Sequence, residues 1–447
     1  MPARQKLILP IALLLCSLLS VPLRAGQVDV RIFSSVTVRE VNISFDLGTY
    51  NLFADDMLLL EPDLAGGRTV HLAPTADGVA VTVNGYDFGV YAKVSLLAND
   101  TASIMCIDPA AVQQRTYEGN IHVSCLSAKS LLLVNSVDFE TYIAGVVQSE
   151  IYGDNTDIFR IQAIISRTWA LRNIDKHSAD GYNFCDNVHC QAYLNRCTRP
   201  DIKLGTMQSY GMTLVDSAGA LIETPFHSNS GGQTANSEDV WRAAVPYLRS
   251  VVDTFSWNMK QSDWHVTMTE NEWLNYFAKK HKVDIASMRD TLLNFRQPTR
   301  AARILDIPLT RVRSDFKLKS TFFDVRYDSL SHVVTLYGHG YGHGVGLSQE
   351  GCIRMVRLGI AYDSVLRHYY TGARVQMDSS VNSQYVNTYI NNLQTIIART
   401  NAPDLSADEK KEDWLRLLFR IRDRSEREEK DDTPPPKEMD SDWQFDW

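Results

Sequence analysis

Short runs in which apolar and polar residues alternate dominate the first third of the chain. A period of two is typical of strands with one buried face, and Gly, Asn and Asp between such runs favour turns. The pattern therefore predicts a strand-rich region over residues 27–140. Its clearest runs cover residues 28–33, 35–45, 78–85, 91–97 and 130–135.

The period changes after Glu150. Apolar positions then recur at i, i+3, i+4 and i+7, which predicts a helix over residues 159–173. Farther on, residues 206–378 mix strand-like and helix-like segments, so we expect an α+β domain over residues 26–378. The segments of this later part are strands at 212–226 and 332–340 and helices at 270–281 and 350–359.

The first 25 residues have the pattern of a secretory signal. Arg4 and Lys6 precede an apolar run over residues 7–19, and the small residue Ala25 follows. This run is shorter than the roughly 20 residues that a membrane span needs, so an uncleaved anchor is the less favoured alternative. No later segment is apolar for long enough to span a membrane, and we expect an exported protein of the periplasm or cell envelope.

Residues 379–447 differ in composition from the rest of the chain and predict a charged appendage. Apolar positions at helical spacing predict a short amphipathic helix around residues 414–421, followed by a disordered end. A solvated helix and a partner-binding segment both fit this pattern. The end carries three aromatic residues at alternate positions, namely Trp443, Phe445 and Trp447.

Charge and cysteine content narrow the possible functions. The formal net charge is −8 and basic runs are absent, which argues against nucleic acid as a partner. Export would permit disulfides among the six cysteines that follow residue 25. For Cys106 and Cys125, a disulfide between neighbouring strands and two free thiols are both open.

One candidate for acid/base chemistry is Glu150, which lies between the strand region and the predicted helix. A lone glutamate before a helix is also typical of a first turn, where the helix dipole favours negative charge. Arg167 follows in the helix, and its guanidinium could point back toward the same cleft. The alternative for Arg167 is a surface ion pair of small energetic value.

Two imidazoles and two thiols occur within fourteen residues in the segment HSADGYNFCDNVHC. They suit a tetrahedral zinc site, although a disulfide with ordinary loop histidines explains the segment equally well. Cys197 lies close enough in sequence to replace one ligand. The four candidate ligands are His177, Cys185, His189 and Cys190.

Two glycine-rich polar segments are candidates for substrate binding. In the first, hydroxyl and amide side chains surround a glycine pair, which suits hydrogen bonding to sugars but also a long turn. The second alternates glycines with histidines, which suits close approach of a ligand but also a buried hairpin. A metal site there with Glu350 or Cys352 has no familiar ligand spacing. The candidate residues are His227, Ser228, Ser230, Gly231, Gly232, Thr234, His339, His343, Ser348 and Gln349.

Taken together, these segments resemble the SpoIID/LytB family of peptidoglycan proteins. The resemblance extends from about Val28 to Gly372, and the segments occur in the order that the family has them. They include LLLVNSVDFETYIAGVVQSE, IQAIISRTWAL, CDNVHCQAY, FHSNSGGQTANSEDVW and YGHGVGLSQEG. The chain departs from the family in its acidic tail and at Cys352, where alanine is usual.

The resemblance implies a lytic transglycosylase that cuts the MurNAc–GlcNAc bond of glycan strands. It places the family's essential glutamate at Glu150 and its helix arginine at Arg167, and it implies structural zinc in the His/Cys cluster. A wall-binding amidase enhancer without lytic activity is the main alternative, and a zinc-dependent wall amidase is a third. The expected partners are peptidoglycan glycan strands and, through the tail, a cell-wall amidase or another wall-remodelling protein.

Overall fold

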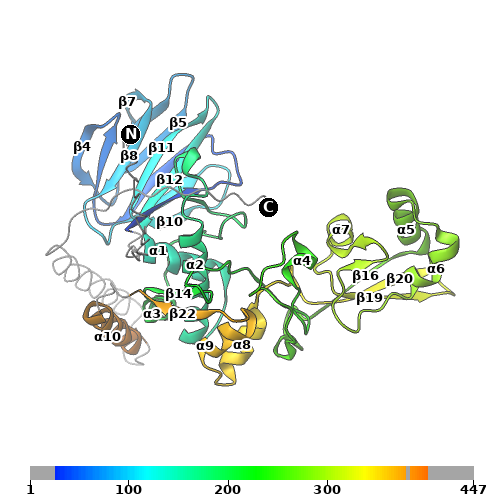
Figure 1. Ribbon diagram of the computed structural model, residues 1–447. Helices are drawn as coiled ribbons and strands as arrows, with labels where there is room; N and C mark the ends of the chain where they lie inside the picture. The colour runs from blue at the N-terminus through cyan, green and yellow to red at the C-terminus, as the bar shows by residue number, and fades with distance from the viewer. Residues whose placement is uncertain (1–25, 379–382, 401–447) are drawn as a thin grey trace, which may run out of the picture.

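The computed structural model describes residues 26–378 and 383–400 and shows an α+β protein (Figure 1). This confirms the predicted fold class, with strands first and a mixture of helices and strands after them. The predicted secretory signal and the predicted helix and aromatic end of the tail lie outside the described residues. Among the described residues, no helix combines the length and apolar character needed to cross a membrane.

Two sheets form the N-terminal part, and residues of both contribute to one hydrophobic core. One sheet has seven strands in the order β13 (Phe184–Cys185), β1 (Gln27–Ile32), β12 (Ser130–Asp138), β11 (Asn120–Ser127), β8 (Lys93–Ala98), β3 (Tyr50–Ala54) and β4 (Met57–Leu64). The other has six strands in the order β10 (Arg115–Glu118), β9 (Ile104–Pro109), β2 (Val41–Leu47), β5 (Thr69–Pro74), β6 (Val79–Val83) and β7 (Tyr86–Tyr91).

The alternation in sequence matches the burial of these strands. In β6, Val79, Val81 and Val83 are buried while the residues between them are partly exposed, as expected for a strand with one face toward a core. The predicted run over residues 35–45 is only half right, because its strand begins at Val41.

The seven-stranded and six-stranded sheets together form a sandwich. A layer of helices packs against the end of this sandwich and shares its core (Figure 1). Strand β12 leads directly into the first helix, and the second helix confirms the periodicity noted at residues 159–173. The helices of this layer are α1 (Phe139–Glu150), α2 (Thr156–Arg172), α3 (Pro200–Gln208), α8 (Gln349–Arg357) and α9 (Tyr362–Tyr369).

A separate lobe extends away from this body (Figure 1) and has its own core, with Trp273 and Phe323 at its centre. Its three-stranded antiparallel sheet has the order β16 (Asp263–Thr269), β20 (Val333–His339) and β19 (Phe323–Asp328). The surrounding elements are α5 (Glu270–Asn275), the π-helix η3 (Tyr276–Lys280), α6 (Ile285–Leu293), β17 (Arg303–Ile304), β18 (Ile307–Pro308) and α7 (Leu309–Asp315).

Short pairings connect segments that are far apart in sequence. Strand β15 (Phe226–His227) pairs in parallel with β21 (Leu347–Ser348), and β14 (Met212–Val215) pairs with β22 (Arg374–Met377). After the second pair, helix α10 (Ser383–Thr400) packs on α3, where Leu393 is fully buried. The remaining short helices are η1 (Ser178–Asp180), α4 (Ser237–Val240) and η2 (Thr254–Ser256).

The structure settles the pairing of Cys106 and Cys125. Cys106 lies on β9 of the six-stranded sheet and Cys125 on β11 of the seven-stranded sheet, and both are free thiols. The disulfide between neighbouring strands is therefore wrong, and the free-thiol alternative holds.

Candidate active site and metal centre

Glu150 is the last residue of helix α1, not a first-turn residue of the next helix. Asp138 caps the start of α1 by accepting a hydrogen bond from the Thr141 N–H, and the apolar face of the helix is buried in the main core. The C-terminal end of a helix carries partial negative charge, which disfavours a carboxylate there. The position of Glu150 thus favours its protonated form.

Glu150 is partly buried. Its side chain and its backbone carbonyl each accept a hydrogen bond, from two segments that are distant in sequence. Its Oε1 accepts a hydrogen bond from the backbone N–H of Ala192 at 2.7 Å. Its backbone carbonyl accepts one from Nε2 of Gln349, at the start of α8, at 3.0 Å. Burial raises the pKa of Glu150, and the hydrogen bond from Ala192 offsets this only in part. A carboxyl group of this kind can donate and then accept a proton.

Arg167 has different partners from those expected, because its guanidinium binds Glu140 and does not extend toward Glu150. Nε and Nη2 of Arg167 donate to the two carboxylate oxygens of Glu140 at 2.7 and 2.6 Å. The guanidinium also donates to the Met212 carbonyl at 3.1 Å and to Ser209 Oγ at 3.4 Å. Arg167 is 1% exposed, so the surface ion pair is wrong as well. Through these contacts the buried Arg167 side chain connects α2 with α1 and with the segment after α3.

The four predicted metal ligands come together in one cluster. Their ligand atoms all lie within 4.8 Å of one another. The Sγ atom of Cys185 is 3.6 Å from Nδ1 of His189, and Sγ of Cys190 is 3.5 Å from Nε2 of His177. Tetrahedral zinc with Zn–S of about 2.3 Å and Zn–N of about 2.0 Å places such atoms about 3.5 Å apart. The donor set and its spacing therefore fit zinc.

Surrounding groups support the same geometry. Asp180 Oδ2 lies 3.0 Å from Nδ1 of His177, the arrangement in which a carboxylate orients a ligating imidazole. A hydrogen bond from Cys190 lowers the pKa of Cys185 to about 4, and the same contact raises the pKa of Cys190, so the two thiols share a proton that a bound metal would displace. Cys197 does not belong to the cluster, because its thiol donates to the carbonyl of Arg199. Four protein ligands leave no open position for a reactive water.

The metal cluster and Glu150 adjoin each other. Residues 191 and 192 directly follow the candidate ligand Cys190, and Ala192 is the residue that donates to Glu150. Gln191 accepts a hydrogen bond from Tyr142 of α1 at 3.2 Å. Sequence alone did not indicate Ala192, because a backbone N–H carries no signal in the residue type.

The two glycine-rich segments lie side by side, joined by the parallel pairing of β15 and β21. Their small polar side chains face inward: Ser230, Thr234 and Ser348 are each at most 1% exposed. Ser230 Oγ donates to Asp253 at 2.7 Å, and Ser348 Oγ caps α8 by accepting from the Gly351 N–H. Gly231 and Gly232 are buried too. These groups therefore satisfy one another within the protein, as the long-turn alternative implies.

Of the candidate histidines, His227 is buried, His343 is half-buried, and the side chain of His339 is 42% exposed. Burial, together with Arg313, lowers the pKa of His343 to about 4, and burial also lowers the pKa of His227. Both are therefore neutral at pH 7. His339, by contrast, is partly exposed and lies 2.9 Å from Asp263. Ser228 is partly exposed, and its carbonyl accepts from the Glu350 N–H.

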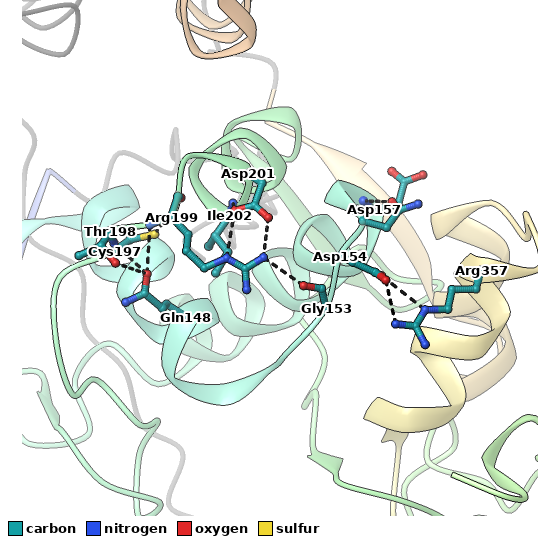
Figure 2. A network of polar contacts seen from close by, with 11 residues as sticks. Gln148, Gly153, Asp154, Asp157, Cys197, Thr198, Arg199, Asp201, Ile202 and Arg357 are labelled. Carbon is teal, nitrogen blue, oxygen red and sulfur yellow. Dashed lines mark hydrogen bonds and ion pairs between the residues drawn. The ribbon is translucent and has the colours of Figure 1, made fainter. Parts of the chain in front are cut away.

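A network of hydrogen bonds and ion pairs fixes the loop that connects Glu150 to α2 (Figure 2). Arg199 donates to the Gly153 carbonyl at 3.0 Å, and Arg357 of α8 binds Asp154 at 3.0 Å. Gln148, near the end of α1, accepts from the Thr198 N–H at 2.8 Å. The residues on both sides of Glu150 are thereby held to separate elements of the body.

Comparisons with known proteins agree with these motifs. Residues 127–216, which contain Glu150 and all four metal-ligand candidates, match the family model SpoIID, described as Stage II sporulation protein. The chain is 26% identical over 279 residues to Stage II sporulation protein D of Bacillus amyloliquefaciens, covering 57% of this chain and 78% of that protein. It is 26% identical over 289 residues to the amidase enhancer of Bacillus subtilis, covering 52% of this chain and 39% of that protein.

The structure is an α+β protein in which residues 127–216 match the SpoIID family model. This match and the named relatives support the SpoIID/LytB resemblance that the motifs had indicated. An uncharacterized protein of Brachyspira hyodysenteriae is also similar, with 25% identity over 268 residues, covering 57% of this chain and 71% of that protein.

Proposed function

We propose that this protein is a peptidoglycan lytic transglycosylase of the cell envelope and that Glu150 is its single acid/base. The observation that carries the proposal is the carboxyl group of Glu150, which is partly buried, has a raised pKa and is held by Ala192. The relatives named for sporulation and for amidase enhancement support a role at the cell wall.

One carboxyl group suffices for this reaction. Protonated Glu150 donates its proton to the glycosidic oxygen as the bond from C1 of MurNAc to that oxygen breaks. The carboxylate then accepts the proton of the MurNAc 6-hydroxyl as O6 bonds to C1 and closes a 1,6-anhydro ring. Glu150 ends protonated again, and no water is consumed. Ordinary glycoside hydrolysis would instead need two carboxyl groups on opposite sides of the sugar.

Zinc would have a structural role in this proposal. His177, Cys185, His189 and Cys190 would hold it, and the ion would stabilise the loop that carries Ala192. The closed set of four ligands argues against a zinc-dependent wall amidase, which needs an open position at the metal.

The test is product analysis on purified sacculi and on isolated glycan strands. A lytic transglycosylase releases fragments that end in 1,6-anhydroMurNAc, whereas a hydrolase releases reducing ends. Purified protein that yields neither product on either substrate contradicts the proposal.

A wall-binding amidase enhancer is the second candidate. The relative with that name is similar over about half of this chain, and most polar residues of the two glycine-rich segments are used within the protein. An assay of a cell-wall amidase with and without this protein separates the two functions. An enhancer raises amidase turnover even when it carries Glu150→Gln, whereas a lytic enzyme loses its own products with that change.

A further inference from the structure

A buried carboxylate joins three separate segments near Glu150. Glu350 is 1% exposed, and no ion pair to it is found in the part of the chain that the structure describes. Its Oε1 accepts from the Tyr152 hydroxyl at 2.9 Å, while its Oε2 accepts from Asn229 Nδ2 at 2.7 Å and from the Gln261 N–H at 3.0 Å. Three donors compensate for the cost of burying the charge.

Three exposed aromatic side chains are connected to this carboxylate. Tyr152, Trp257 and Tyr341 are 53%, 52% and 43% exposed, although large aromatic rings are usually well covered. Tyr152 binds Glu350 directly. The other two rings are connected to Glu350 through Asn229. The Nδ2 atom of Asn229 also donates to the carbonyl of Ser256, the residue before Trp257. The backbone N–H and carbonyl of Asn229 pair with those of Tyr341 at 3.1 and 2.8 Å.

The first two rings are held in place although they face solvent. Tyr152 lies in sequence between Glu150 and the loop that Arg199 and Arg357 fix (Figure 2), and its hydroxyl is anchored on Glu350. The ring of Trp257 covers Gly232 so closely that a Cβ atom there would lie 2.1 Å from the indole Nε1. This contact explains why the polar loop has a glycine at that position.

An aromatic ring that is rigid and exposed on one face suits the apolar face of a pyranose ring, because little conformational entropy is lost on binding. We propose that Tyr152, Trp257 and Tyr341 form a glycan-binding surface beside Glu150, and that Glu350 and Asn229 position it. Its ligand is a strand of β-1,4-linked amino sugars. This inference rests on the proposed function, and it assigns the rings that would orient the strand at the carboxyl group.

Position and chemistry favour a glycan over a protein partner. Tyr152 follows Glu150 by only two residues, so the two Cα atoms lie within about 7 Å of each other along the chain. Polar groups accompany the rings: Lys319 Nζ is 5.6 Å from the ring of Tyr341 and donates to Gln261 Oε1 at 3.4 Å. Aromatic rings accompanied by hydrogen-bonding groups match a saccharide, which alternates apolar faces with hydroxyl and acetamido groups.

The test measures binding without cleavage. All variants carry Glu150→Gln, and each is titrated calorimetrically with a soluble N-acetylglucosamine oligosaccharide. Tyr152→Ala and Trp257→Ala should each weaken binding about 5- to 10-fold, the scale of one aromatic contact. Tyr152→Phe keeps the ring and loses its anchor, so its effect should be smaller. Tyr86 of β7 is 75% exposed on the sandwich and supplies the matched control, because Tyr86→Ala should bind as the parent does.

Three outcomes would overturn the inference: no binding by the parent, unchanged binding in both alanine variants, or equal weakening in Tyr86→Ala. Far-ultraviolet circular dichroism verifies that each variant is folded, and Trp257→Ala still decides the case if Tyr152→Ala fails to fold. Cleavage is measured separately, in proteins that keep Glu150. If the protein with Glu150 releases no anhydro product although its Glu150→Gln form binds the oligosaccharide, the binding surface stands and the proposed activity fails. If a protein with Glu150 and both alanine changes cleaves glycan strands normally, the activity stands and the surface fails.

Discussion

One carboxylate oxygen of Glu150 lies 2.7 Å from the backbone nitrogen of Ala192, two residues after Cys190. The residue proposed as acid/base is therefore held by the same loop that supplies the last candidate metal ligand. Because the hydrogen bond goes to a backbone N–H, its position depends on the shape of that loop. A change at the metal cluster should consequently reach Glu150.

Glu150→Gln should abolish release of anhydro products while the protein stays folded. Glutamine keeps an oxygen that can accept from Ala192, but it cannot donate and then accept a proton. The rate should fall by at least about 10²-fold, as is usual when a general acid is removed. Muropeptide analysis after digestion of sacculi measures the loss. Near-normal turnover in this variant would end the assignment of Glu150.

The same substitution should change how stability depends on pH. The folded pKa of Glu150 is raised above the ordinary value of 4.5, so the folded state holds its proton more tightly than the unfolded state does. The stabilisation from the protonated form is complete below the unfolded pKa and is lost as pH rises through the folded pKa. Glutamine does not titrate. The unfolding free energy of Glu150→Gln, relative to that of wild type, should therefore increase as the pH rises from the unfolded to the folded pKa of Glu150.

Denaturant titrations of both proteins at several pH values above and below 4.5 give this difference. A difference that stays constant with pH would mean that burial does not raise the pKa of Glu150.

Metal removal should lower both stability and activity. We expect about one zinc per chain, bound by the four clustered residues, and a Cys185→Ser Cys190→Ser variant should lose it. Elemental analysis of protein purified without chelator measures the metal, and thermal unfolding measures the stability. Cys125→Ser is the control, because Cys125 is a free thiol of the sandwich and should leave the metal content unchanged. Equal zinc in wild type and the double variant, or none in either, would contradict the prediction.

Arg167 and Glu140 should matter for stability more than for chemistry. Their side chains are 2% and 15% exposed, and removing one partner of such a pair leaves a buried charge, at a cost of about 3–5 kcal/mol. Arg167→Ala and Glu140→Ala should both lower the unfolding free energy by amounts of this order. Arg167→Lys keeps the charge but loses the paired contact, so its cost should be smaller.

The decisive measurement is turnover per folded molecule. An Arg167→Lys variant that is as stable as wild type and yet has lost most of its turnover would restore Arg167 to a catalytic role.

The sequence predicted those features of the fold and the site that depend on residues close together in the chain. The sandwich strands follow from alternation, helix α2 follows from positions such as Ile161 and Ile165, and the metal cluster follows from ligands within fourteen residues. Helix α1 was missed because β12 ends at Asp138 and α1 begins at Phe139, with no Gly or Pro between them to mark a boundary. The capping residue Asp138, followed by Tyr142, Ile143 and Val146 at helical spacing, was the signal that would have found it.

Contacts between distant residues had no such signal. Tyr152 and Glu350 are 198 positions apart, and only the packing of α8 beside the end of α1 brings them together. The pairing of Arg167 with Glu140 likewise depends on how α2 packs on α1. Hydroxyl and amide side chains beside glycines predicted a polar site, but they did not reveal that Ser230 and Ser348 point inward, because the same residues suit turns and ligands alike.

The last prediction concerns the appendage that begins at residue 379. Every motif with a chemical rationale ends by Gly372, and the charged composition of the appendage suits a solvated segment, so cleavage should not need it. Its first part nevertheless belongs to the folded body, because α10 packs on α3 and buries Leu393 against Leu204 and Met207. The boundary that matters for stability should therefore lie after α10 and not at residue 379.

Two truncated proteins test this boundary. A protein that ends at Thr400 should match wild type in stability and in its rate on isolated glycan strands. A protein that ends at Met377 should unfold at a lower temperature, because the apolar side chains that α10 covers become exposed, but it should keep its rate per folded molecule. Thermal unfolding and release of anhydro products from one batch of glycan strands give both quantities. If the Thr400 truncation is as stable as wild type and yet loses most of its cleavage, residues 401–447 are needed for the reaction and the prediction is wrong.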